Sequence, residues 1–210
     1  MNQELEPMLR RSPVIPVLTI ETVEIALPLA RALVKGGLPL LEITLRTQKA
    51  LDVIEAVAAE VEHAVVGAGT VLNANQLDQA TKRGAKFAVS PGVSDQLLSA
   101  AADNPVPLLP GTATASDVMR LLDSGYCFMK FFPAEPAGGR AYLKALSAPL
   151  QAAKFCPTGG IGIENAQDYL SLPNVICIGG SWVAPADAIQ AADWPRIETL
   201  ARQAASLESE

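Results

Sequence analysis

Short hydrophobic runs alternate with amphipathic stretches along the whole chain. The runs are nearly continuous and partly β-branched, as is typical of parallel strands buried on both faces. They predict eight strands: VIPVLTI from Val14, LLEITL from Leu40, VVGAGTV from Val65, KFAVSP from Lys86, PLLPG from Pro107, YCFMKFFP from Tyr126, KFCPTGG from Lys154 and VICIGGS from Val175.

The stretches between these runs carry signals for helix starts and stops. Capping residues and glycines mark most of the boundaries. The expected helices run from Thr22 to Lys35, from a cap at Asn75 to Gly84, onward from a cap at Ser94, from a Thr114–Asp117 capping box to Gly125, and from Pro185 and Asp187 to about Ala205.

Strand and helix recur about every 20 to 27 residues without a linker or a break in composition. Eight such units predict an α/β fold, a closed (β/α)₈ TIM barrel, in one domain spanning residues 1–210. An extra N-terminal helix, Gln3 to Arg11, is expected to plug the barrel bottom. An open doubly wound sheet is the alternative, disfavoured because no G-x-G-x-x-G follows the first strand.

Composition and charge indicate which classes of binding partner the protein can have. The chain has 50% hydrophobic and 18% charged residues and a net charge of -6, which indicates a globular protein and argues against binding nucleic acid. No apolar run approaches the roughly 20 residues of a membrane span, and the N-terminus is too polar for a signal peptide. Cys127, Cys156 and Cys177 lie in apolar runs and are expected to be buried thiols, which favours the cytoplasm.

The single histidine limits the possible chemistry. His63 follows a helical stretch, where a solvated surface position is expected. A zinc site or a Ser-His-Asp triad would have to be built around this one residue, so both are disfavoured. No metal and no organic cofactor is expected.

Lys130 is the sharpest chemical signal, because it lies in the apolar run CFMKFFP. Strand alternation places Phe128, Lys130 and Phe132 on one face and Met129 and Phe131 on the other. Burial favours the neutral amine, which is the form that attacks a carbonyl group. A lysine reaching water from a strand end, or paired for structure alone, is the alternative.

Glu42 and Arg46 belong to LLEITLRT, where a period of two puts both on one face with Thr44. They are interpreted as a proton shuttle and a binder of a substrate carboxylate, the alternative being a plain buried salt bridge. Glycine pairs follow the last two strands, where barrels of this kind often bind phosphate through backbone N–H groups. The residues concerned are Thr158, Gly159 and Gly160, then Gly179, Gly180 and Ser181.

Several motifs together resemble the 2-keto-3-deoxy-6-phosphogluconate aldolases and the related 2-keto-4-hydroxyglutarate aldolases. They are EITLRT from Glu42, VGAGTV from Val66, SPG from Ser90, KFFPAE around Lys130, FCPTGGI from Phe155 and IGGSW from Ile178. The resemblance covers essentially the whole chain in order.

The resemblance implies a class I aldolase of the Entner–Doudoroff pathway that is a homotrimer and cleaves a phosphorylated keto acid. It implies that Lys130 forms the imine and that Glu42 is the general acid and base. The pyruvate end would be lined by Arg46, Thr70, Pro91 and Phe132. The phosphate end would be lined by Thr158, Gly159, Gly160, Gly180 and Ser181.

Other functions fit parts of the pattern. The residues do not rank phosphogluconate-type against hydroxyglutarate-type substrates. A phosphosugar isomerase or epimerase on the same barrel would use Glu42 as a base without covalent chemistry. A non-catalytic phosphate-binding barrel would leave the cost of burying a lysine, a glutamate and an arginine unexplained.

Overall fold

Strands and helices alternate through the computed structural model, which describes residues 2–207. The strands are β1 (Val14–Leu18), β2 (Leu40–Thr44), β3 (Val65–Gly69), β4 (Phe87–Val89), β5 (Leu108–Leu109), β6 (Gly111–Thr112), β7 (Phe128–Phe131), β8 (Lys154–Pro157) and β9 (Ile178–Gly180). The helices are η1 (Gln3–Leu5), α1 (Glu6–Leu9), α2 (Val23–Lys35), α3 (Ala50–Glu60), α4 (Ala74–Lys82), α5 (Asp95–Ala102), α6 (Ala115–Asp123), α7 (Gly139–Ser147), α8 (Ile163–Leu170), α9 (Ala186–Gln190) and α10 (Trp194–Ala205).

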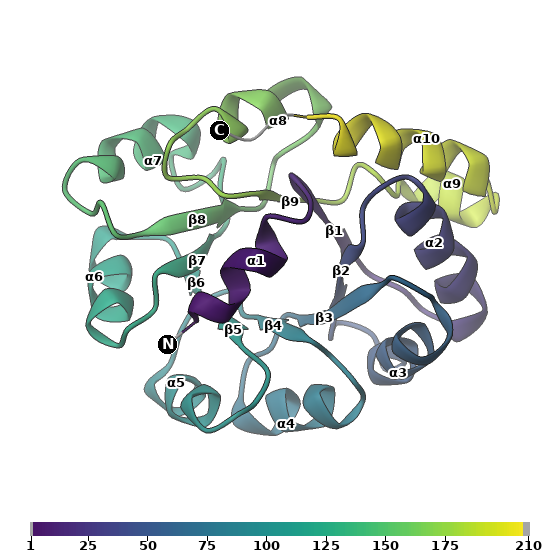
Figure 1. Ribbon diagram of the computed structural model, residues 1–210, viewed down its shortest axis with the longest axis horizontal. Coiled ribbons are helices and arrows are strands. Elements are labelled where there is room, and N and C mark those ends of the chain that lie inside the picture. Colours follow the sequence, from purple (N-terminus) through teal and green to yellow (C-terminus); the bar gives the residue numbers. More distant parts are fainter. Residues whose placement is uncertain (1, 208–210) are drawn as a thin grey trace.

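The strands form a closed ring with helices around it (Figure 1). Parallel pairing links them in the orders β5-β4-β3-β2-β1-β9 and β6-β7-β8. The expected fifth strand is split into β5 and β6 by Pro110, which has no N–H for the ladder. Isolated bridges from Phe155 to Val175 and from Thr158 to Gly179 join β8 to the β9 side. The (β/α)₈ barrel is therefore confirmed, and the open sheet is wrong.

Helix boundaries differ from the sequence prediction at α4 and in the last helical stretch, as well as at the N-terminus. The cap of α4 is Asn73, whose side chain accepts a hydrogen bond from Gln76 N, and not Asn75. The expected last helix is two helices, because Ala192 adopts a positive φ of 51° between α9 and α10. Asp193 then caps α10 by accepting from Arg196 N.

The caps at Ser94 and Thr114 are confirmed, the second as a complete capping box with Asp117. His63 is exposed on the surface, as expected. Within residues 2–207, no helix is long and apolar enough to cross a membrane.

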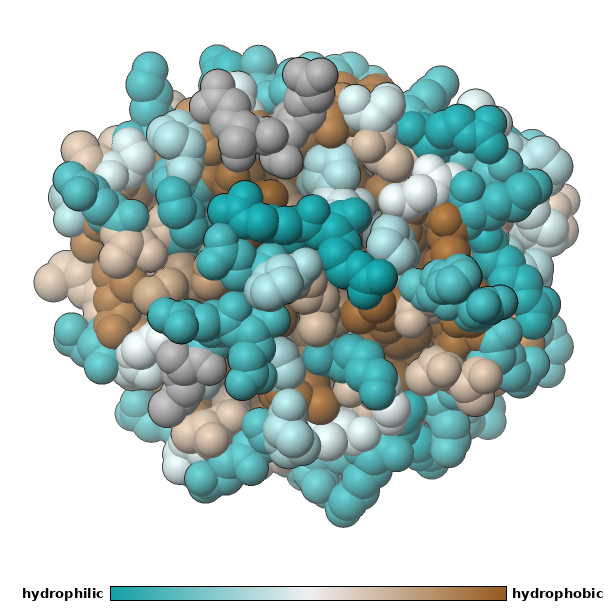
Figure 2. All heavy atoms as spheres, in the orientation of Figure 1, coloured by the Kyte–Doolittle hydropathy of each residue, from teal (hydrophilic) through white to brown (hydrophobic). Residues whose placement is uncertain are grey.

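The N-terminal segment closes one end of the barrel, as predicted, but the expected helix from Gln3 to Arg11 is the 3₁₀ turn η1 followed by the short helix α1. Leu5 and Leu9 are buried in the same interior cluster as Ile15 and Phe128. The side chain of Asn2 donates to Leu108 O and Phe128 O, at the first residues of β5 and β7. Figure 1 shows α1 across the middle of the ring, and Figure 2 shows hydrophilic side chains over the middle of the same face. The opposite end of the barrel therefore contains the carboxyl ends of the strands.

Inward and outward positions alternate along the strands as the sequence predicts. Leu40 and Phe128 belong to the barrel interior, whereas Leu41 and Met129 pack in the layer between strands and helices. Two residues further along each strand, Glu42 and Lys130 point inward above the apolar floor and contact each other.

Candidate active site

Lys130 and Glu42 form a buried pair inside the barrel. Lys130 Nζ lies 3.1 Å from Glu42 Oε1, and the two residues are only 6% and 3% exposed. Burying two charges costs desolvation free energy, which their mutual attraction must offset. A carboxylate in hydrogen-bond contact with an amine can also take its proton, and the neutral amine is a nucleophile.

The backbone fixes both members of this pair. Lys130 N donates to Pro110 O at 2.8 Å, and Thr112 Oγ1 donates to Lys130 O at 3.0 Å. On the neighbouring strand, a Cβ at Gly69 would lie 2.3 Å from Glu42 Oε1. Only a glycine at position 69 leaves room for the carboxylate in its present place.

Arg46 is oriented from the end of β2. Its Nε donates to Thr44 Oγ1 at 3.1 Å, and Thr44 Oγ1 donates to Leu18 O at 2.9 Å. Thr19, directly after β1, shares a 3.1 Å hydrogen bond with Thr44. Thr19 was not among the predicted site residues, because the predicted strand VIPVLTI runs past it, whereas β1 ends at Leu18.

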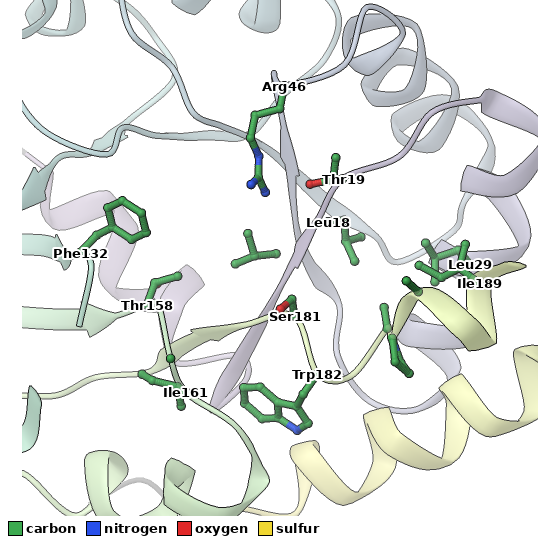
Figure 3. A pocket seen from close by; sticks show the side chains of 16 residues that line it. Leu18, Thr19, Leu29, Arg46, Phe132, Thr158, Ile161, Ser181, Trp182 and Ile189 are labelled. Carbon is green, nitrogen blue, oxygen red and sulfur yellow. The ribbon is translucent and has the colours of Figure 1, made fainter. Parts of the chain in front are cut away.

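A cavity of about 650 Å³ opens beside the pair at the ends of β1, β8 and β9. Figure 3 shows the Arg46 guanidinium pointing into it, with Phe132 and Thr158 on one side, Thr19 on the other and Ser181 across from Arg46. The lining also includes the apolar side chains of Leu18, Leu29, Trp182 and Ile189, which were not predicted. The predicted residues that line the cavity are Arg46, Phe132, Thr158, Gly159, Gly160 and Ser181.

The buried pair is connected to this cavity through Phe132. Lys130 Nζ lies 5.4 Å from the centroid of the Phe132 ring, which is within the range of a cation–π interaction. Thr158 Oγ1 is buried and has no hydrogen-bond partner among the described residues. A buried hydroxyl in that condition has unused hydrogen-bonding capacity.

Three other predicted residues lie outside the cavity lining. Thr70 has a positive φ of 59°. It directly follows Gly69, the residue that leaves room for the Glu42 carboxylate. Pro91 lines a separate hollow of about 230 Å³ with Val71 and Leu97. Gly180 lies under the Trp182 ring, which itself lines the cavity.

The three cysteines are free thiols. Cys156 and Cys177 are buried as expected, but Cys127 is only partly buried, because it precedes the first residue of β7 at the barrel bottom. The neighbouring Cys156 and burial raise the pKa of Cys177 well above its usual range. The floor under Glu42 therefore carries a neutral thiol. Among residues 2–207, no cluster of three or more His, Cys, Asp or Glu could hold a metal ion.

A barrel with a buried amine and carboxylate beside a cavity lined by a guanidinium and hydroxyls has the layout of an enzyme acting on an anionic carbonyl compound. The family model "KDPG and KHG aldolase" matches residues 5–200. The KHG/KDPG aldolase of Escherichia coli K12 is 51% identical over 199 residues, covering 95% of this chain and 93% of the relative. The chain belongs to the KDPG and KHG aldolase family.

Solved structures agree in fold. The 2-keto-3-deoxy-6-phosphogluconate aldolase of Zymomonas mobilis ZM4 with 3-phosphoglycerate matches with a TM-score of 0.95 and 46% identity, covering 100% of this chain and 98% of that one. The KDPG aldolase of Legionella pneumophila, with pyruvate captured as a covalent carbinolamine, matches with a TM-score of 0.92 and 45% identity, covering 94% and 96%.

Proposed function

We propose that this protein cleaves 2-keto-3-deoxy-6-phosphogluconate to pyruvate and glyceraldehyde 3-phosphate through an imine on Lys130. The observation that carries the proposal is the buried contact of 3.1 Å between Lys130 Nζ and Glu42 Oε1. The names of the relatives, and the carbinolamine in the Legionella structure, support it.

The first half of the reaction builds an electron sink. Glu42 takes a proton from Lys130, and the neutral amine attacks the C2 ketone. Glu42 gives its proton to the departing hydroxyl group, so loss of water leaves a protonated imine and an ionised Glu42 carboxylate. Glu42 then removes the proton of the C4 hydroxyl, directly or through water. The C3–C4 bond breaks, its electron pair moves into the imine, and the aldehyde phosphate leaves.

The second half restores the enzyme. Glu42 returns a proton to C3 of the enamine, and hydrolysis of the resulting imine frees pyruvate and the Lys130 amine. Both proton transfers involve one carboxylate that lies against the nucleophile, so no second general acid is required.

The two ends of the substrate are assigned to different groups. We propose that Arg46 binds the carboxylate with its planar fork of donors and that Thr70, Pro91 and Phe132 complete the pyruvate end. Thr158, Gly159, Gly160, Gly180 and Ser181 are assigned to the phosphate end. Arg46, Thr158 and Ser181 line one cavity, which supports their binding the same substrate molecule.

A second substrate has its own support. The Escherichia coli relative is named for both activities, and 2-keto-4-hydroxyglutarate would use the same imine and carboxylate contacts. Comparison of kcat/KM for the two substrates decides between them. A ratio near one would make this a dual-specificity enzyme, and a large ratio would assign one principal substrate.

The cellular setting is also part of the proposal. We propose that residues 1–210 act as one catalytic domain, supported by the family match over residues 5–200. The protein is expected to be a cytoplasmic homotrimer of the Entner–Doudoroff pathway. Light scattering of the purified protein tests the trimer.

Trapping with borohydride tests the chemistry. Incubation with pyruvate and sodium borohydride should add the mass of one reduced pyruvate adduct per chain, on the peptide that contains Lys130. Lys130→Met should remove both the adduct and the aldolase activity. An isomerase, an epimerase or a non-catalytic barrel would give no adduct. An adduct that persists in Lys130→Met would assign the imine to another lysine.

A further inference from the structure

The glutamate that ends the KFFPAE run has no part in the chemistry above, yet it lies behind the glycine turn after β8. Glu135 accepts hydrogen bonds at Oε1 from the Tyr169 hydroxyl and from Asn165 Nδ2. Burial of Tyr169, and the carboxylate beside it, raise the pKa of that hydroxyl. Tyr169 therefore stays protonated and remains a donor to Glu135.

Asn165 continues this contact into the turn. Its Nδ2 also donates to Gly160 O at 3.2 Å, and its Oδ1 accepts from Gly162 N at 2.9 Å. The backbone of Glu135 holds the peptide between Gly159 and Gly160, because Glu135 N donates to Gly159 O at 3.0 Å. The carbonyl groups of Gly159 and Gly160 are thus both fixed on the side of Glu135 and Asn165.

Because trans peptides are planar, the fixed carbonyl groups also fix the direction of the N–H groups in the same peptides. In a trans peptide the N–H points opposite to the C=O of the same unit. The carbonyl of Gly159 shares its peptide with Gly160 N, and the carbonyl of Gly160 shares its peptide with Ile161 N. These two N–H groups therefore point away from Glu135 and Asn165, and Gly160 and Ile161 both line the cavity.

Packing leaves the turn little freedom to adopt another arrangement. A Cβ at Gly160 would lie 2.7 Å from both Cβ and Cγ of Glu135, and Gly160 has a φ of +79°. The aliphatic part of Glu135 is therefore in direct contact with the turn, while its carboxylate holds the two side chains from α8.

We propose that Glu135 is a positioning residue for the phosphate end of the substrate, acting through Asn165 and Tyr169. It fixes the turn at residues 159–161 so that the Gly160 and Ile161 N–H groups are set for a phosphate before the substrate arrives. Preorganised donors bind an anion without the cost of ordering the loop. The inference rests on the proposed function, since it assumes that the substrate phosphate occupies this turn.

The test separates the two ends of the substrate. Glu135→Ala should raise KM for 2-keto-3-deoxy-6-phosphogluconate by about tenfold or more, because displaced donors bind less well. Exchange of pyruvate methyl protons with deuterated water should continue at the original rate, since Lys130 and Glu42 are untouched. Glu135→Gln keeps an acceptor oxygen for Tyr169 and should restore most of the affinity.

Two further variants sharpen the result. Asn165→Ala should give a similar rise in KM, and combining it with Glu135→Ala should add little, as expected for residues in one network. Asp168→Ala, on the same helix α8, removes an exposed ion pair with Arg140 and should leave KM unchanged.

The outcomes exclude one another. A raised KM with unchanged pyruvate exchange supports the inference, and so does restoration by glutamine. Three results would overturn the inference. KM could stay unchanged in Glu135→Ala, or cleavage and pyruvate exchange could fall by the same factor. The third is that Glu135→Gln behaves like Glu135→Ala. Failure of the proposed function would show separately, as unmodified protein that neither traps pyruvate nor cleaves the phosphorylated substrate.

Discussion

At the scale of single residues, the buried pair of Lys130 and Glu42 costs desolvation free energy, but it also places a proton acceptor against an amine. Neither Lys130 nor Glu42 is solvated by bulk water, so each depends on the other. Removing one charge leaves its partner unpaired in the barrel, whereas an isosteric change keeps the contact. The most informative substitutions at this site are therefore those that preserve shape.

Glu42→Gln tests the proton transfer without emptying the site. The amide keeps an oxygen near Lys130 but cannot take up a proton. Water can still take the proton of Lys130, so the variant should form the pyruvate imine slowly, while turnover falls by about 10² to 10⁴. NMR of pyruvate methyl-proton exchange in deuterated water measures the step directly. Exchange at the original rate would mean that another group moves the proton.

Gly69→Ala tests whether the position of the Glu42 carboxylate matters. The added methyl group would come within 2.3 Å of Oε1, so the carboxylate must move. We expect kcat to fall at least about tenfold, since small misplacements of catalytic groups are costly. Gly92→Ala is the matched control, because a Cβ there meets nothing within 4 Å. Equal kcat in the two variants would contradict the expectation.

Much of the site follows from the period of two along each strand. That period was enough to predict that Glu42, Arg46 and Lys130 point toward one end of the barrel. It could not reveal the 3.1 Å contact between Lys130 and Glu42, because strand register depends on pairing between distant segments. It also could not reveal the role of Gly69, since the need for a glycine arises from the neighbouring strand.

At the scale of elements, local signals worked where a side chain bonds to its own helix. The caps at Ser94 and Thr114 were predicted because each bond closes within three residues. The caps at Asn73 and Asp193 were missed for different reasons. Asn73 and Asn75 are near neighbours, and either could cap α4. Asp193 lies in a stretch whose hydrophobic pattern continues from α9 into α10.

Thr114→Ala tests the contribution of a cap. The change deletes the hydrogen bond from Asp117 N to Thr114 Oγ1. The free energy of unfolding should fall by about 0.5 to 2 kcal/mol, measured by urea denaturation. Thr114→Ser keeps the hydroxyl and should stay close to the unmodified protein. A serine variant as unstable as the alanine variant would show that the methyl group, and not the cap, stabilises this segment.

At the scale of the whole molecule, the two ends of the barrel have separate tasks. The floor is apolar and closed by Leu5 and Leu9, whereas the opposite end carries the polar residues. The sequence predicted this division from the placement of polar residues at strand ends. The split at Pro110 was not predicted, because a proline at a strand end and one within a strand look alike without the neighbouring strands.

Leu9→Ala tests this division of tasks. Removing a fully buried leucine side chain leaves a hole in the floor and should destabilise the protein by about 2 to 5 kcal/mol. The kcat of the folded protein should change little, because the reacting groups lie above the floor. Arg11→Ala, an exposed change in the same segment, should alter stability by less than about 0.5 kcal/mol. A large loss of kcat in folded Leu9→Ala protein would show that the two ends are coupled.

Closure of the ring also sets an order of events during synthesis. β1 needs β9 along one edge, and Val14 pairs with Ile178, so a strand made early must wait for one made near the end. Until then the nascent chain carries an open sheet edge and a Glu42 carboxylate, made 88 residues before its partner Lys130. Such an intermediate is exposed to aggregation and depends on rapid completion or on chaperones. The buried pair of Lys130 and Glu42 can be sealed from water only after the ribosome has delivered almost the whole chain.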